Sequence, residues 1–474
     1  MNVENRLALS RRGALGALGG AMALGLAGKA FAQATQSNAS EAAEIVLRGG
    51  YVLSMDPALG DLETGDVHVR DGSIVEVAPE IAAPGALEID ARNTVVMPGF
   101  VDTHWHMWNS IWRGMANDAS SYFALHGLAA HYTPQDHYIA VRYAALEALS
   151  AGFTTCHNWA HGADTIEDAE AELRALADTG IRAKMGLAGF LGGQPTTRDQ
   201  VQAMLDWIAS NGGGRIGLGM ILDGAGEALS ERVELARNLD LRPITDHGGS
   251  LAQPDLLGPE FLFTHGTAVT PEQIALILDK HLGVALCPGT DPMIGAGLPP
   301  IHALLAGGVP LDQISMTVDV TAQTPADPFA MLRTIVNAGR IQQANNPNLM
   351  SIVQAAPQWL LSYRDALAIG TRGGANVLGL GDQVGSLTPG KRADIIAVRT
   401  DALNMIPAAN TNMTFQLVQH GLPSNVDTVI VDGHIRKQAG ALVGVEVREI
   451  LAEAAESQAA IRKRAGLPPL DTSL

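Results

Sequence analysis

The central part of the chain alternates short apolar runs with longer amphipathic segments. Eight apolar runs have the length of β-strands: residues 99–105, 154–158, 182–187, 214–222, 242–247, 261–265, 283–287 and 314–319. Two of the amphipathic segments open with the helix-start pairs Thr133-Pro134 and Thr270-Pro271. Eight strands that alternate with helices predict a (β/α)₈ TIM barrel over residues 98–384, with its chemistry at the C-terminal ends of the strands.

The segments on either side of the predicted barrel have a different pattern. Residues 43–97 and 385–444 contain short β-rich runs joined by turns such as Asp71-Gly72 and Pro389-Gly390. Because both flanks share this pattern, we expect a small β-sandwich module built from both chain ends. A helical tail follows over residues 445–474. The predicted fold class is α/β, a TIM barrel with one appended β module.

The first 32 residues have the features of an export signal. Arg11-Arg12 precede a Gly/Ala/Leu-rich stretch, and Ala30-Phe31-Ala32 fits a small-x-small cleavage site. The stretch is too short and too rich in glycine for a stable membrane span, although an uncleaved N-terminal anchor is the alternative. We therefore predict a twin-arginine signal peptide over residues 1–32, a periplasmic protein, and no stable membrane insertion after signal removal.

Composition narrows the classes of partner. The chain has 31 basic and 49 acidic residues, a formal net charge of −18, which disfavours binding to nucleic acid or an anionic membrane. A small-molecule substrate is the expected partner, and the oligomeric state stays open, a homo-oligomer included. The two cysteines, Cys156 and Cys287, build no disulfide framework, and we interpret them as small buried residues.

Ligand-type residues end several of the predicted strands. Asp102, His104 and His106 alternate at the end of the first strand, so their side chains share one face, while Trp105 points to the other. The fifth, sixth and eighth strands end in further ligand-type residues, which are His247, His265 and Asp319. Nitrogen and oxygen ligands in one barrel mouth predict one divalent metal ion, with Zn²⁺ preferred and Fe²⁺, Co²⁺ or Mn²⁺ as alternatives.

Five stretches in order along the chain carry a family resemblance: residues 97–106 (MPGFVDTHWH), 151–155 (AGFTT), 264–266 (THG), 287–288 (CP) and 385–394 (GSLTPGKRAD). With them the chain resembles the metal-dependent amidohydrolase superfamily, in the branch of cytosine deaminase and the triazine chlorohydrolases. The resemblance implies metal ligation by His104, His106, His247 and Asp319, with His265 beside the metal-bound water or the substrate oxygen. Binuclear members use a lysine of the fourth strand, which residues 214–222 lack, so a single metal ion is expected.

Two positions depart from the family pattern. Deaminases of this branch carry a proton-shuttling glutamate three residues after the fifth-strand histidine, where this chain has Ser250. Leu286 replaces the histidine that usually precedes the seventh-strand Cys-Pro. A serine hydroxyl cannot replace a carboxylate as a proton carrier at neutral pH, so the sequence disfavours deamination.

The leading hypothesis is therefore a metal-dependent hydrolase that cleaves a C–N bond of an amide, urea, carbamate or lactam through a metal-activated water. Asp319 is expected to take the proton of that water, and His265 to hold the developing oxyanion. The first alternative is a deaminase or chlorohydrolase that acts on an N-heterocycle. The second is a periplasmic binding protein without catalysis.

Aromatic residues follow the first two strands and suggest an apolar or aromatic substrate. The competing interpretation is that these side chains pack against helices or cover a loop. The residues expected to bind substrate are Trp108, Asn109, Trp112, His157 and Trp159.

Overall fold

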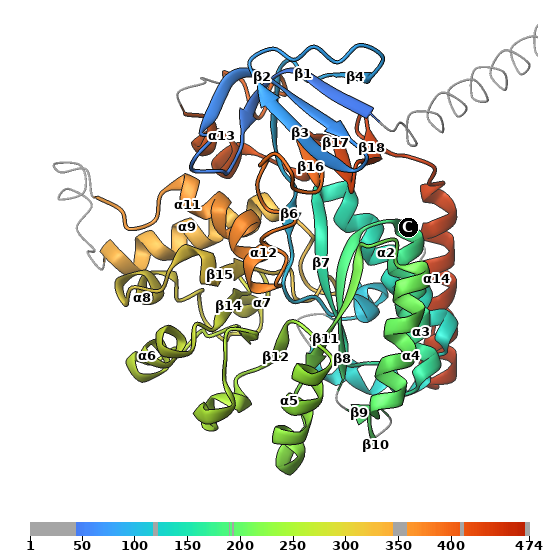
Figure 1. The fold of residues 1–474 in the computed structure, drawn as a ribbon. Coiled ribbons are helices and arrows are strands. Elements are labelled where there is room, and N and C mark those ends of the chain that lie inside the picture. The colour runs from blue at the N-terminus through green and yellow to red at the C-terminus, as the bar shows by residue number, and fades with distance from the viewer. Residues whose placement is uncertain are drawn as a thin grey trace, which may run out of the picture.

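The computed structural model describes residues 44–116, 122–188, 190–191, 194–344, 358–407 and 412–469. The predicted signal peptide and the last five residues of the predicted tail lie outside this part of the chain. Figure 1 shows a β module on top of a larger body in which helices surround a second sheet, with the C-terminal helix along one side. Among the described helices, none is both long and apolar enough to span a bilayer.

The larger body is built around eight parallel strands, at the eight predicted positions. They are β6 (Phe100–Val101), β7 (Phe153–Ala160), β8 (Arg182–Ala188), β11 (Ile216–Ile221), β12 (Ile244–Asp246), β13 (Phe261–Thr264), β14 (Gly283–Leu286) and β15 (Ile314–Met316). They pair in sequence order, and a bridge from Trp105 to Asp319 closes the circle between the first strand and the last. The predicted TIM barrel is confirmed.

Helices form the outer layer of the barrel and its loops. The α-helices are α2 (Pro134–Ala151), α3 (Ile166–Thr179), α4 (Arg198–Asn211), α5 (Leu229–Asn238), α6 (Pro271–Lys280), α7 (Thr290–Met293), α8 (Ile301–Ala306), α9 (Pro328–Ala344), α11 (Tyr363–Ala368), α12 (Gly374–Val377), α13 (Met413–His420) and α14 (Val447–Arg464). The predicted starts of α2 and α6 are confirmed, because Thr133 and Thr270 each form a capping box there. Two 3₁₀ segments, η1 (Met107–Trp112) and η2 (Tyr122–His131), follow the first strand.

The module draws strands from both chain ends, as predicted. They are β1 (Glu44–Leu53), β2 (Asp61–Arg70), β3 (Ser73–Ala78), β4 (Leu87–Asp90), β5 (Thr94–Pro98), β16 (Ile395–Arg399), β17 (Val426–Val431), β18 (His434–Gln438) and β19 (Ala441–Leu442). Antiparallel pairing of β5 with β16 joins the N-terminal strands to the C-terminal ones, so all nine belong to one mixed sheet. Residues from both ends, such as Leu47, Val67 and Ile430, share its hydrophobic core.

The module attaches to the barrel at the N-terminal ends of the strands. Arg182, the first residue of β8, forms a two-pronged ion pair with Asp394 and also contacts Asp432 of the module. Arg392 of the module binds the same oxygen of Asp432, Oδ1. This junction, which we call the base of the barrel, leaves the C-terminal strand ends, the mouth, on the far side.

The first barrel strand is shorter than predicted. Regular pairing of β6 covers only two residues, whereas the prediction extended to residue 105. The ladder with β7 is interrupted at residues 103 and 104, where the Asp102 carboxylate accepts hydrogen bonds from the backbone N–H groups of His104 and Val318, at 3.1 and 2.6 Å. Pairing resumes at Trp105, whose N–H donates to the His157 carbonyl at 3.0 Å. Period-2 alternation therefore does not continue through residue 106, although His104 and His106 still point to one place.

Candidate metal centre

Three side-chain atoms converge at the floor of the mouth. The Nε2 atoms of His104 and His106 lie 3.2 Å apart, and Asp319 Oδ1 lies 3.3 and 3.2 Å from them. Ligand atoms of a tetrahedral zinc ion with bonds of 2.0–2.1 Å are separated by about 3.3 Å. The three atoms thus have the spacing of neighbouring ligands of one metal ion.

The backbone around these ligands is tied together and strained. His106 N donates to the Asp319 carbonyl, and Asp319 N donates to the His104 carbonyl, at 2.8 and 3.0 Å. The Thr317 hydroxyl also donates to the His104 carbonyl. Asp319 and His265 both have positive φ angles, 63° and 64°, which residues other than glycine and asparagine rarely adopt. Strain of this kind persists only where surrounding contacts over-determine the backbone, which is typical of functional sites.

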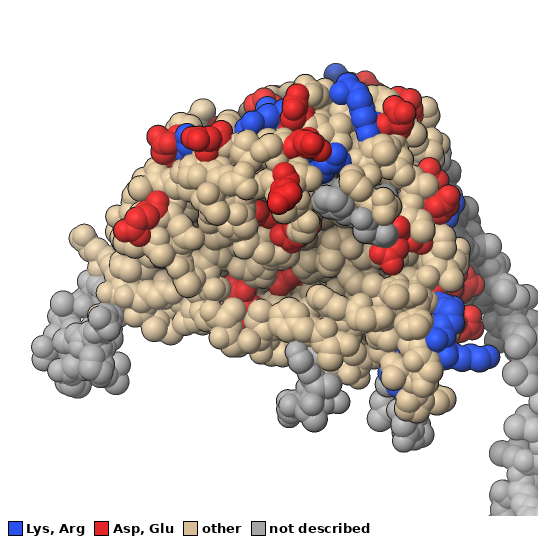
Figure 2. Space-filling view, turned by 90° about the horizontal axis from the view of Figure 1, so that it is seen from below, with Lys and Arg blue, Asp and Glu red and all other residues tan. Residues whose placement is uncertain are grey.

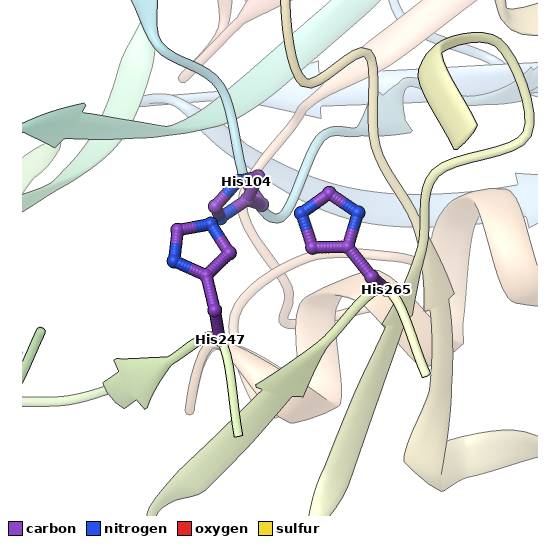
Figure 3. Close-up of side chains that lie close together, drawn as sticks. All are labelled: His104, His247 and His265. Carbon is purple, nitrogen blue, oxygen red and sulfur yellow. The ribbon is translucent and has the colours of Figure 1, made fainter. Parts of the chain in front are cut away.

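Two more histidines stand around the same point. Figure 3 shows the rings of His104, His247 and His265 facing one another from three separate segments. Their nearest ligand-type atoms all lie within 4.8 Å of one another. The centroids of His247 and His265 are 5.2 Å apart, and each lies 5.3–5.5 Å from that of His104. Four histidines and one carboxylate therefore form two groups of three that share His104, at the ends of the first, fifth, sixth and eighth strands.

We call His104, His106 and Asp319 the floor of the site and His247 and His265 its rim. Carboxylates outside the predicted set orient the two rim histidines. Asp223, which follows β11, binds His247 Nδ1 and accepts from its backbone N–H. Asp291, at the start of α7, accepts from His265 Nδ1 at 2.7 Å. A carboxylate on Nδ1 fixes the tautomer and leaves Nε2 for a metal ion or a substrate. Neither aspartate was predicted, because Asp223 lies in a loop and Asp291 in a four-residue helix, α7, and neither segment has a sequence periodicity.

Electrostatics separates the floor from the rim. Burial would raise the pKa of Asp319, but hydrogen bonds from His104 and His106 lower it well below the usual range. Burial lowers the pKa of both floor histidines. Burial would also lower the pKa of His265, yet its bond to Asp291 raises that pKa. At neutral pH the floor thus offers neutral imidazoles and an ionised carboxylate, while the bond to Asp291 shifts His265 towards its doubly protonated form.

These residues fit a divalent metal ion. Neutral imidazole nitrogens and a carboxylate oxygen are the borderline ligands that Zn²⁺ and neighbouring transition metals prefer. In the described part of the chain, no Lys or Arg pairs with Asp102, Asp223, Asp291 or Asp319, so side chains supply no fixed positive charge there. His104, His106, His247 and Asp319 would hold the ion, and it would supply Lewis acidity and lower the pKa of a bound water.

Ser250 offers no acid or base to the site. Its backbone N–H and hydroxyl both bond to the Asp246 carboxylate, at 2.6 and 3.2 Å, and the residue is buried. Asp246 also accepts from Gly248 N, so its carboxylate closes the turn after β12. The usual shuttle position is therefore occupied by a residue with a structural role.

The residues expected to bind substrate lie beneath the surface. Trp159 packs its ring against His104 and His247, with centroid separations of 4.0 and 4.7 Å. Trp108 and Trp112 pack on each other at 4.9 Å. Each of the two polar residues already uses one hydrogen-bonding atom within the protein. Asn109 donates to the Tyr122 hydroxyl, and His157 Nδ1 donates to the Thr103 carbonyl. The exposed fraction is at most 1% for all five, which are Trp108, Asn109, Trp112, His157 and Trp159. Substrate contact by them stays a prediction.

Both cysteines are buried, and burial raises the pKa of each thiol well above its usual range. Lys184, the one lysine of the predicted barrel strands, has no ion pair in the described part of the chain, and burial lowers its pKa. Its ammonium lies near Gly217 of β11.

Known proteins share this architecture. The family model described as Amidohydrolase family matches residues 95–220 and 201–436. A 5-methylthioadenosine/S-adenosylhomocysteine deaminase of Symbiobacterium thermophilum is 28% identical over 88% of this chain and 98% of its own length. A 5'-deoxyadenosine deaminase of Methanobrevibacter smithii is 25% identical over 82% of this chain and 92% of its own.

Solved structures agree on the fold. An adenosine deaminase from Xanthomonas campestris with bound zinc has a TM-score of 0.74 and 23% identity, over 88% of this chain and 98% of its own. The atrazine chlorohydrolase from Arthrobacter aurescens TC1, complexed with zinc, has a TM-score of 0.73 and 22% identity, over 87% and 100%. The match to the family model spans well over half of the sequence. The chain belongs to the amidohydrolase family and is a metal-dependent hydrolase acting on C–N bonds.

Proposed function

We propose that this hydrolase removes an amino group from a ring carbon of an N-heterocycle of the adenine-nucleoside class. The relatives described above are named as deaminases of adenosine-type compounds, or as a chlorohydrolase of a triazine. They favour the heterocycle alternative over the amide-type substrates that the sequence favoured. The reaction consumes one water and releases ammonia.

The observation that carries the proposal is the division of the site into a buried floor and an accessible rim. The side chains of His104 and Asp319 are 0% and 5% exposed, whereas those of His247 and His265 are 42% and 22% exposed. Substrate therefore approaches over His247 and His265. Water attacks from the side of the floor residues, so it meets the ring carbon of the substrate between the floor and the rim.

Asp319 and His265 have complementary roles in this arrangement. The low pKa of Asp319 keeps it ionised, so it accepts the proton of the attacking water and later returns one to the leaving nitrogen. His265, held by Asp291, donates from Nε2 to the substrate atom on which negative charge develops. No separate glutamate at position 250 is required.

The charge around the mouth favours a neutral ring. Figure 2 shows the face away from the β module, where acidic side chains reach the middle and Lys and Arg lie mostly towards the edges. Such a surface repels phosphorylated compounds. We therefore expect nucleosides or free heterocycles, not nucleotides, as substrates.

A second candidate follows from Ser250. Without a carboxylate at that position, cleavage of an amide, urea, carbamate or lactam needs only the floor residues and His265. This candidate shares the metal centre and differs in the leaving group and substrate.

The deciding experiment compares substrates on one zinc-loaded preparation. Ammonia release is measured from adenosine, 5'-methylthioadenosine and a free aminated heterocycle, and hydrolysis from an anilide, a urea and a carbamate. We expect kcat/KM for the best heterocycle to exceed that for the best amide-type compound by at least tenfold. The reverse order would establish the second candidate, and no turnover in either set would refute both.

A pair of variants tests whether a carboxylate at position 250 increases ammonia release. Ser250→Glu restores a carboxylate at the family position, and Ser250→Gln has the same shape without an ionisable proton. If the chain is a deaminase, ammonia release by the folded glutamate variant should exceed that by the glutamine variant. Equal rates in two variants with native circular dichroism would show that no proton passes through this position.

We also propose that the protein is exported to the periplasm by the twin-arginine route, on the basis of Arg11-Arg12 and the Ala30-Phe31-Ala32 pattern. Replacement of both arginines by lysine should retain folded, active protein in the cytoplasm. Unchanged delivery to the periplasm would instead indicate the general secretion route.

A further inference from the structure

A second group of metal-ligand residues adjoins the floor of the mouth. Ligand-type atoms of His265, Cys287 and Asp319 all lie within 4.8 Å of one another. His265 follows β13, Cys287 follows β14 and Asp319 follows β15, so three consecutive strands of the barrel contribute one residue each. The group shares Asp319 with the His104–His106 pair and His265 with the rim.

We propose that His265, Cys287 and Asp319 form a second metal position, containing sulfur, beside the one at His104 and His106. This inference rests on the metal centre of the proposed function and adds a ligand that the resemblance does not assign. The position would take a soft or borderline divalent ion such as Zn²⁺, Co²⁺ or Cd²⁺.

The surroundings of Cys287 support a cation there. Its side chain is fully buried, and Asp291 donates its backbone N–H to the Cys287 carbonyl at 3.1 Å. Asp291 Oδ2 is also buried and has no hydrogen-bond partner among the described residues, although Oδ1 holds His265. Unsatisfied buried carboxylate oxygens are costly, and a nearby positive charge reduces that cost.

Geometry makes Asp319 the shared residue. Its Oδ1 faces the two floor imidazoles, and a carboxylate has a second oxygen with which it can bind another ion. His265 would bind through Nε2, because Nδ1 is engaged by Asp291. The same nitrogen donates to substrate in the proposed function, so hydrolysis belongs to the chain with one ion and a second ion would inhibit it. A bound ion displaces the thiol proton of Cys287, since the thiolate is the form that ligates metals.

The second position should be weaker than the first. It has three protein ligands, whereas the first has four, His104, His106, His247 and Asp319. We therefore expect one tightly held ion per chain in the purified protein and a second only when a second zinc equivalent is added.

The test uses zinc X-ray absorption on the full chain after titration to one and then two zinc equivalents. The first equivalent should show only nitrogen and oxygen neighbours, and the second should add a sulfur neighbour at about 2.3 Å. The chain offers a matched control, because Cys156 is the only other cysteine and is also buried, on β7. Cys156→Ser should retain the sulfur neighbour and two equivalents. Cys287→Ser and Cys287→Ala should lose both the sulfur and the second equivalent.

Absence of a sulfur neighbour in the wild-type protein at two equivalents would overturn the inference. Persistence of sulfur in folded Cys287→Ala would overturn it as well, since Cys156 would then be the ligand. Ammonia release at one equivalent tests the proposed function independently. A sulfur signal without turnover would support the second metal position and refute the proposed function. Turnover without a sulfur signal would support the proposed function and refute the second metal position.

Discussion

The two ends of the barrel bury charged groups in opposite ways. At the base, Arg182 pairs with Asp394 and Asp432, and Arg392 pairs with Asp432. Positive and negative side chains there neutralise one another within the protein. At the mouth, no Lys or Arg pairs with the described carboxylates, and three of them, Asp223, Asp291 and Asp319, bind histidines instead.

The difference separates structural charge from functional charge. A buried ion pair at a domain junction fixes how two parts of the chain fit together and needs no additional partner. A cluster of carboxylates and imidazoles without a fixed cation is completed by an ion or a substrate. The base therefore determines how the β module sits on the barrel, and the mouth determines what the protein binds.

The largest expected effect is at the mouth. Asp319→Asn keeps the shape and one oxygen ligand but removes the proton acceptor, so kcat should fall on the order of 10²- to 10⁴-fold with KM nearly unchanged. Metal content is measured in the same sample, because loss of the ion would mimic the defect. A variant that keeps its metal and near-normal kcat would show that Asp319 is not the base.

The corresponding change at the base should affect stability alone. Arg182→Met leaves Asp394 buried without its cation and should lower the free energy of unfolding by about 3–5 kcal/mol. Arg92→Met, which breaks the exposed pair with Asp90, is the matched control and should leave stability nearly unchanged. Denaturant unfolding measures both. A lower kcat in the fraction of Arg182→Met that remains folded would contradict the view that the base contributes to stability and not to catalysis.

A smaller effect is expected from the carboxylates that orient the rim. Asp291→Asn keeps an acceptor for His265 but removes the charge, and kcat should fall by about 10-fold with the tightly bound metal retained. Asp223→Asn, the same exchange behind His247, should instead weaken metal affinity by about 10- to 100-fold. Identical effects of the two variants on kcat and on metal affinity would contradict the separate roles of His265 and His247.

A pH-dependent effect is expected from Lys437, which is an exception to the ion pairing at the base. Lys437 donates to the Ser150 carbonyl and has no ion pair in the described part of the chain, and burial lowers its pKa from 10.5 to about 8. Between these pH values the unfolded chain holds more protons than the folded one, so the free energy of unfolding should rise with pH from about 8 to 10.5. Lys437→Met should flatten this part of the curve. An equal slope in both proteins would assign the rise to other groups.

Much of the fold could be predicted because local patterns agree with it. The eight strands are apolar runs of the correct length, and the Thr133 and Thr270 caps mark helix starts through contacts within three residues. The convergence of His104, His247 and Asp319 could be inferred from their places at strand ends, since all strands of a barrel end at one face.

The remaining features depend on contacts that leave no periodic signal. Asp223 reaches its histidine from a loop and Asp291 from the four-residue helix α7, so nothing in the neighbouring residues marks them. The interruption of the first strand at residues 103 and 104 lies beside the Asp102 carboxylate, whose partner Val318 lies 216 residues away in the sequence. The burial of Trp108 beneath a loop likewise depends on tertiary packing, because an aromatic side chain suits a binding surface and a core equally well.

The most direct test of the account is the metal content of the purified protein, followed by elemental analysis while hydrolysis is assayed before and after chelation. The account predicts one tightly held divalent ion per chain, loss of hydrolysis to background when it is removed, and recovery when Zn²⁺ is returned. Arg182→Met should keep its ion, because the base takes no part in binding it. A metal-free protein that hydrolyses its substrate at the original rate would contradict the account.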